Sequence, residues 1–212
     1  MDKIKFGLFD IFVYTIPGVV VCFAVYLFHA DITQGLRSFT QACNKIVYEL
    51  NAYTVILSFF ISYLLGFVLH YFGYRYFGTV APRLWKKSFD GRGKHISANE
   101  EKYVIVRHRS KENFVYVDQW NTYRGMSFNL SLSLLIVAIE VFVKMIIGRY
   151  FSLDWLLILL LLLLMSFVTL RRAVTFHMWS LRTLEESIKM LQETPTEDVL
   201  AKNPGKGDTD VS

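Results

Sequence analysis

The feature that most constrains the fold is an almost unbroken leucine run, "LDWLLILLLLLLMSFVTL", at residues 153–170. A helix needs about 20 mainly apolar residues to cross the roughly 30 Å hydrocarbon core of a bilayer. A helix that is apolar on every side does not suit the surface of a soluble protein. Arg171 and Arg172 close the run with two positive charges. The run therefore predicts a membrane span that ends near residue 170.

Three further apolar runs of similar length precede it, at 8–29, 52–74 and 126–147. The 212 residues are 53% hydrophobic and 19% charged, which is too apolar for an ordinary soluble domain. A cleavable signal peptide is the alternative for the first run, but "VYLFHADITQ" lacks a small-x-small cleavage motif. We therefore expect an all-α, polytopic membrane protein with four transmembrane helices.

The positive charges predict how these spans are oriented. The segment 75–125 carries eleven lysines and arginines, and six follow residue 170. The connection at 30–51 carries two, and the turn at 148–152 carries one. Because positively charged segments resist translocation, we expect both termini and the segment 75–125 to be cytoplasmic.

The segment 75–125 is too long for a plain connection, and we expect it to form a basic cytoplasmic module. Tyr103 and Val106 fit the apolar stripe of one helix. A second stripe, at spacings of three, runs into span three and consists of Phe114, Val117, Trp120 and Tyr123. "FVYVDQW" also fits a strand by residue type. We favour a helical hairpin packed beneath the bundle.

Beyond span four, residues 171–193 predict a cytoplasmic amphipathic helix. Its apolar residues share one side: Val174, Met178, Leu181, Leu184, Ile188 and Leu191. We expect this stripe to remain available for a partner. The polar, proline- and glycine-containing tail at 194–212 is predicted to be disordered. Residues 1–74 then hold the N-terminal end and spans one and two, and residues 126–170 hold spans three and four.

Glu140 and Lys144 are two charges inside the third apolar run. A charge at the centre of a bilayer costs about 2.5–3.5 kcal/mol on insertion scales, so the two residues should face protein or water. Their spacing of four, with the glutamate first, also favours pairing along one helix face. The pair predicts a pore wall, a proton site or a subunit contact. The alternative is a self-paired charge that only helps helices to pack.

The first run contains Pro17 and Gly18 near its middle. Proline removes one backbone donor and presses against the preceding turn, so a kink or a break is expected there. One interpretation is a hinge that lets the first span tilt. The other is a kink that serves only packing.

Small and polar residues in spans two and three predict which helix faces meet protein. Ser58, Ser62 and Gly66 are spaced so that another helix can approach closely. On the cytoplasmic half of span three, Asn129 and Ser131 are candidates for a pore wall or a subunit contact. Packing within one subunit explains the same residues. We expect spans two and three to face protein and span four to face lipid.

Seven basic residues are candidates for binding a partner or lipid headgroups: Lys86, Lys87, Arg107, Arg109, Lys111, Arg171 and Arg172. Each lysine or arginine close to an anionic membrane surface contributes about 1 kcal/mol to binding. A soluble cytoplasmic protein is the other candidate partner. Because these charges lie next to predicted spans, we do not expect direct binding of nucleic acid.

No motif of an enzyme is present. The sequence has no nucleophile elbow, phosphate loop or kinase signature, and its five histidines show no metal-ligand spacing. His70 and His177 are expected to be interfacial residues. We therefore expect no catalytic residue, no metal site and no cofactor.

The stretch "FDIFVYTIPG", the four spans and the basic cytoplasmic hairpin together resemble the small membrane subunits of bacterial antiphage defence operons, such as the four-span component of the Kiwa system. The resemblance covers residues 8–190 at the level of architecture. It implies a sensor of envelope disturbance in the bacterial inner membrane that docks a soluble effector through its cytoplasmic face, or a membrane-disrupting effector. Independently of the resemblance, the short outer loop and the small residues on one helix face predict a homo-oligomer. A channel remains the alternative function.

Overall fold

The computed structural model describes residues 2–29, 40–41, 44–45, 48, 51–89, 96–148 and 151–193, with no side chains described at 2–10, 28–29 and 96–99. In this part of the chain all regular structure is helical. The principal helices, in chain order, are α1 (Asp2–His29), α3 (Ala52–Leu84), α4 (Lys86–Phe89), α5 (Ile96–Arg109), α6 (Lys111–Gly148) and α7 (Leu153–Glu193). The predicted all-α class is confirmed for the described residues. The expected disordered tail lies outside them.

Three helices, α3, α6 and α7, are long and apolar enough to cross a membrane. They contain the runs predicted as spans two, three and four. The described apolar stretch of α1, Ile11–Leu27, is shorter. Within α3 the first residues are held by a capping box, in which Asn51 and Thr54 each bond to the backbone of the other.

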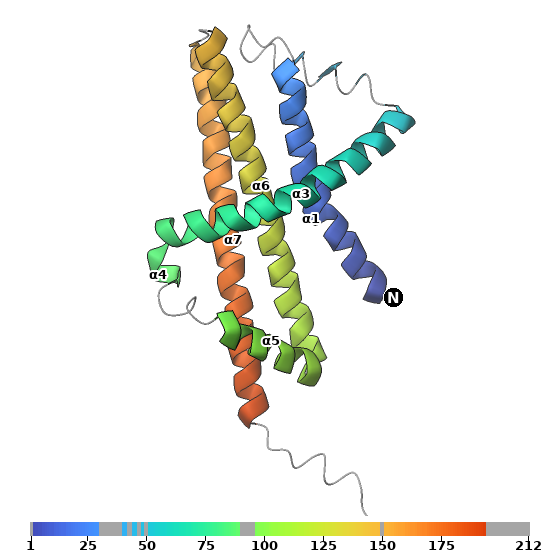
Figure 1. The fold of residues 1–212 in the computed structure, drawn as a ribbon, viewed down its shortest axis with the longest axis vertical. Helices are drawn as coiled ribbons and strands as arrows, with labels where there is room; N and C mark the ends of the chain where they lie inside the picture. The colour runs from blue at the N-terminus through green and yellow to red at the C-terminus, as the bar shows by residue number, and fades with distance from the viewer. Residues whose placement is uncertain are drawn as a thin grey trace, which may run out of the picture.

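Of the kink or break expected at Pro17, the structure contains no break. α1 is a single helix that includes this proline, and Figure 1 shows it bending part-way along without interruption. A proline inside a helix removes one hydrogen bond and pushes the axis aside, and the bonds on either side can persist. The kink is therefore accommodated within a continuous helix.

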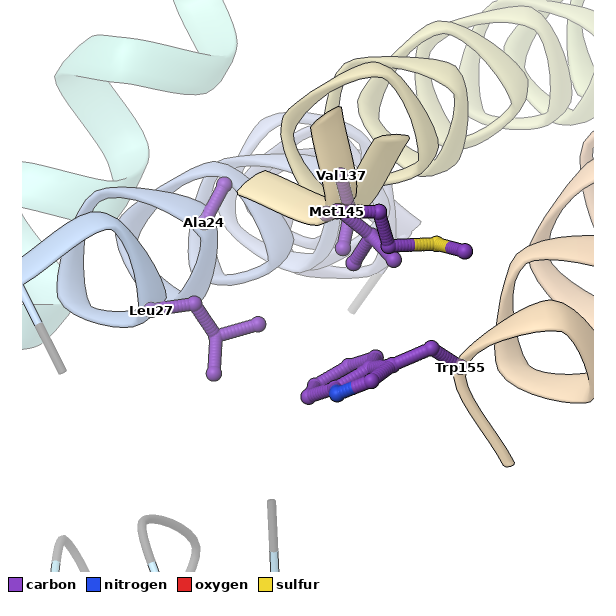
Figure 2. Packing of buried hydrophobic residues seen from close by; sticks show 6 residues of the cluster. Ala24, Leu27, Val137, Met145 and Trp155 are labelled. Carbon is purple, nitrogen blue, oxygen red and sulfur yellow. The ribbon is translucent and has the colours of Figure 1, made fainter. Parts of the chain in front are cut away.

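α6 and α7 lie side by side and run in opposite directions (Figure 1). Both continue far past the ends of their apolar runs, so the expected boundaries at 125/126 and 170/171 fall inside unbroken helices. Near the α6–α7 turn, the Trp155 indole is 2% exposed and packs with Leu27 of α1 and Met145 of α6 (Figure 2). This cluster joins three helices at one end of the bundle.

At the other end, α5 packs against the start of α6 and the end of α7. Val106, Val117 and Leu184 form a buried cluster there, one residue from each helix. Tyr103 and Phe114 pack against it, which confirms the helical hairpin and leaves the strand alternative wrong. We call this cluster and the three helix segments around it the terminal module.

The terminal module also corrects the expectation for the apolar stripe of residues 171–193. Leu184 is 4% exposed, and Ile188 and Leu191 pack against the same cluster. Val174 and Met178 pack with Phe77 of α3 and Phe128 of α6. The stripe is thus covered by the chain's own helices, because the hairpin folds back onto α7. It is not available for a partner.

α3 crosses the other helices obliquely (Figure 1). Its buried residues follow a single line: Ser62, Gly66, Leu69, Gly73, Phe77 and Ala81. Much of the remaining apolar surface is exposed, including Phe60, Leu64 and Phe67. The expectation that span two mainly faces protein is therefore wrong. An oblique helix touches its neighbours over a short length, so most of its circumference is left uncovered.

Candidate functional site

Polar side chains of α6 bond to the three neighbouring long helices inside the apolar part of the bundle. The Asn129 amide nitrogen lies 2.9 Å from Nδ1 of His70 on α3. Ser131 donates to the carbonyl oxygen of Ser166 on α7 at 2.8 Å. Ser133 donates to the carbonyl oxygen of Pro17 on α1 at 3.0 Å. These bonds satisfy buried groups within one subunit, so they fit the packing alternative for Asn129 and Ser131.

Arg124 and His177 form a second polar layer, where the apolar runs of α6 and α7 end. A guanidinium nitrogen of Arg124 lies 2.9 Å from Nδ1 of His177. Arginine can only donate, so Nδ1 accepts and the histidine proton sits on Nε2. Phe89 stacks on the imidazole, and Phe77 meets it edge-on. Burial, and next the charge of Arg124, lower the pKa of His177 to about 4. The imidazole is therefore neutral at physiological pH.

The polar contacts continue into the terminal module. Ser180 of α7 donates to the side-chain oxygen of Asn121 at 3.0 Å. Tyr103 of α5 donates to the Asp118 carboxylate at 3.2 Å. Polar contacts thus recur along α6 from residue 118 to residue 133. Each fixes which residue of the neighbour lies opposite, because a shifted register would leave buried polar groups unbonded.

Glu140 and Lys144 lie nearer the end of the bundle that holds the Trp155 cluster. The Lys144 amine donates to the backbone carbonyl of Leu27 on α1, and this bond crosses between helices. One carboxyl oxygen of Glu140 is buried without a hydrogen-bond partner. Lys144 therefore faces α1, as expected of a charge that avoids lipid.

Buried polar atoms without a hydrogen-bond partner gather on the same helix. Among the described side chains they are Thr15 Oγ1, Arg124 Nε, Asn129 Oδ1 and Glu140 Oε1. Three of the four belong to α6. A buried polar atom that lacks a partner costs about 1–3 kcal/mol, and more when it is charged. Among the described side chains, α6 therefore carries most of the buried polar atoms that lack a hydrogen-bond partner.

Pro17 and Gly18 lie where α1 crosses α3. A Cβ on Gly18 would overlap the backbone carbonyl of Ser62, and a Cβ on Gly66 would overlap that of Tyr14. The two backbones therefore touch directly, which only glycine permits at these positions. Ser62 and Gly66 line this crossing as the spacing predicted, but Ser58 is exposed. The close contact accounts for Gly18 by packing.

All seven basic candidates are exposed, but they do not form one site. Arg107, Arg109 and Lys111 lie at the corner between α5 and α6. Lys86 and Lys87 are in α4, and Arg171 and Arg172 directly follow the leucine run of α7. Arg107 also lies over the Phe114 ring at 5.6 Å. The corner of α5 and α6 is therefore the densest exposed basic group of the terminal module.

Sequence reasoning missed the roles of Arg124, His70 and His177. The two histidines were expected to be interfacial, yet each bonds to a side chain of α6. Arg124 stands two residues before an apolar run, and that position was a signal that it could be buried. Spacing alone could not reveal its partner, which is 53 residues away.

Comparison with known proteins adds no relative to this description. No family model matches the chain, and neither a curated protein nor a solved structure matches it.

Proposed function

We propose that this protein is a membrane-embedded sensor or scaffold that couples its membrane helices to a soluble cytoplasmic partner. The observation that carries the proposal is the continuity of α6 and α7. Each runs as one helix from the outer Trp155 cluster into the terminal module. Helices of 38 and 41 residues act as stiff struts, so a displacement at one end reaches the other.

The buried polar layers support this coupling. The Arg124–His177 contact ties α6 to α7 just before the terminal module, and the Asn121–Ser180 contact ties them within it. Sliding one helix along the other would separate these groups and leave a buried guanidinium without its acceptor. The two helices should therefore move together, and the terminal module should move with them.

The partner surface in this proposal is the basic corner formed by Arg107, Arg109 and Lys111. All three are exposed, and they lie next to the buried Val106 that anchors α5. Such a surface suits an acidic patch on a soluble protein, because complementary charge speeds association and fixes orientation. The stripe of α7 is excluded from this role, since α5 and α6 cover it.

The proposal includes four spans with both termini in the cytoplasm. In Figure 1, α6 and α7 run lengthwise in opposite directions, and α3 crosses them and α1 obliquely. α5, which belongs to the segment 75–125 rich in lysine and arginine, lies near the end of the α6–α7 pair that we assign to the cytoplasm. We extend the proposal to antiphage defence in the bacterial inner membrane, as the architectural resemblance implies, and to a homo-oligomer, as the small residues on one helix face suggest.

Affinity purification with crosslinking tests the partner surface. The protein is expressed with its neighbouring genes, and soluble proteins that co-purify are quantified. Arg107→Glu with Arg109→Glu should reduce capture at least tenfold, because it turns attraction into repulsion. Arg182→Glu with Lys189→Glu is the matched control, with the same charge change on exposed residues of α7. Equal loss in both variants, or no captured protein, would refute the basic corner as the docking site.

A pore or channel is the second candidate, and Glu140 is the observation that favours it. Its partnerless buried oxygen is the group expected where water or an ion enters a bundle. Planar-bilayer recording of the purified protein tests this function. Conductance without any partner, with ion selectivity altered by Glu140→Gln, would favour the pore over the scaffold. The absence of any conductance in the bilayer would rule out the pore.

A further inference from the structure

A cluster of aromatic rings lies on the α6–α7 pair just past the leucine run. Trp120 stacks on Phe176 with ring centroids 5.9 Å apart and lies 4.9 Å from Trp179. Tyr123 joins at 5.5 Å from Phe176. The rings are partly exposed, and Trp179 is 38% exposed. We call these four rings the aromatic platform.

Arg172 is held against the aromatic platform. Its guanidinium lies 4.8 Å from the centre of the Phe176 ring and 5.3 Å from that of Trp179. Contact with ring faces fixes the plane of the guanidinium and leaves N–H edges able to bind an anion. Arg171 is equally exposed, but the described rings make no such contact with it. Arg171 and Arg172 therefore carry the same charge, but aromatic rings hold only the Arg172 guanidinium in place.

The position along α7 identifies the surroundings of the platform. The apolar run of 18 residues ends at Leu170 and spans about 27 Å, close to the thickness of the hydrocarbon core. Arg172 thus falls where the lipid phosphates begin. Tryptophan and tyrosine concentrate at this depth because their rings combine an apolar body with a polar edge.

The charges around Arg172 favour an anion. α7 carries no aspartate or glutamate between Asp154 and Glu185. On α6 the nearest carboxylate, Asp118, accepts a hydrogen bond from Tyr103. Arg171 adds a second positive charge beside Arg172. An anionic headgroup would therefore meet two arginines and no acidic residue of α7.

We propose that Arg172 and the aromatic platform bind the phosphate of one anionic phospholipid in the leaflet on the side of α5. The guanidinium donates two N–H bonds to the phosphate oxygens. The rings hold the guanidinium in place beside the headgroup. This site is separate from the basic corner, so it can be tested without any soluble partner.

Native mass spectrometry of the detergent-purified protein tests the site, with phosphatidylglycerol and phosphatidylcholine as probes. We expect phosphatidylglycerol to be retained more strongly. Arg172→Ala should weaken its binding roughly tenfold, the effect of losing charge-assisted bonds. Arg171→Ala removes the same charge from the adjacent residue and should weaken binding much less. Arg172→Lys, which keeps the charge but not the planar fork, should fall between the two.

Several outcomes would overturn the proposal. Equal losses for Arg171→Ala and Arg172→Ala would mean that only general charge attraction operates. Equal retention of the two lipids would remove the anion preference. Displacement of phosphatidylglycerol by inorganic phosphate at millimolar concentration would identify a soluble anion as the ligand. Trp179→Ala gives a second route, because it should weaken lipid binding while leaving every charge in place.

Discussion

α1 and α3 meet backbone to backbone at one crossing, whereas α6 and α7 pack side chain to side chain along most of their length. At the crossing, Gly18 and Gly66 each lie against a carbonyl of the other helix. Along the long pair, contacts extend from Trp155 at one end to Leu184 at the other. The α1–α3 contact is therefore short and brings the two backbones together, whereas the α6–α7 contact is long and made by side chains.

The difference reflects how helices associate in lipid. Burying apolar side chains there gains little, because lipid tails are equally apolar, so contact must come from close approach or hydrogen bonds. Glycine gives close approach at one point and leaves the remaining surface of α3 uncovered. Ser131, Asn121 and Arg124 give hydrogen bonds that repeat along α6. The first arrangement tolerates a steep crossing, and the second requires nearly parallel axes.

The strongest test of this contrast is Gly66→Ala. The added methyl group would meet the Tyr14 backbone, so α1 and α3 must separate, and we expect a loss of about 3 kcal/mol in the free energy of unfolding. Unfolding by sodium dodecyl sulfate, followed by circular dichroism, measures it. Gly78→Ala is the control in the same helix, where a Cβ meets nothing within 4 Å. It should gain up to about 1 kcal/mol from helix propensity. Similar effects at both positions would disprove the close crossing.

The polar layer of the long pair should respond to pH. His177 has a folded-state pKa of about 4, below its ordinary 6.5, so the unfolded chain binds a proton more readily. Its contribution to stability is therefore complete above pH 6.5 and is lost as the pH falls toward 4. The steepest slope is roughly 1.4 kcal/mol per pH unit.

Unfolding free energies of the wild type and His177→Gln, measured at a series of pH values, isolate this term. Glutamine can still accept from Arg124 but does not titrate in this range. The difference between the two curves should appear only below pH 6.5. A His177→Gln curve parallel to the wild type would contradict the neutral, buried histidine.

The smallest effect is expected for the hydroxyl pair between α6 and α7. Ser131 and Ser166 exchange bonds with each other's backbone at 2.8 and 2.9 Å. A double-mutant cycle with Ser131→Ala and Ser166→Ala should give a coupling energy of about 0.6 kcal/mol, as for other hydrogen bonds within membranes. A coupling above about 2 kcal/mol would show that this single layer, rather than the whole seam, holds the pair.

Several elements of the fold could be read from local pattern. The leucine run, the apolar run of α6 and the stripe of Tyr103 and Val106 each predicted a helix that the structure contains. The small residues Ser62 and Gly66 predicted a close helix contact. Such signals survive because spacing on a helix depends only on helix geometry.

The candidate site was read less well. Glu140 and Lys144 were identified because charge among apolar residues is visible in any sequence. The Arg124–His177 contact was missed. The apolar stripe that includes Leu184 was expected to bind a partner, but α5 and α6 of the same chain cover it. Both errors concern residues far apart in the chain. A stripe shows that something must cover it, but not which helix does so.

The sequence by itself determined that the chain contains helices long and apolar enough to cross a membrane, and that a helix continues beyond the leucine run. Hydrophobicity and helical spacing are properties of neighbouring residues, so no tertiary information was needed. The tertiary structure alone decided that Gly18 meets Ser62, that His177 accepts from Arg124 and that α5 covers α7. Each depends on which of several compatible surfaces pack together, and that choice is made by the packing and hydrogen bonding of the whole bundle.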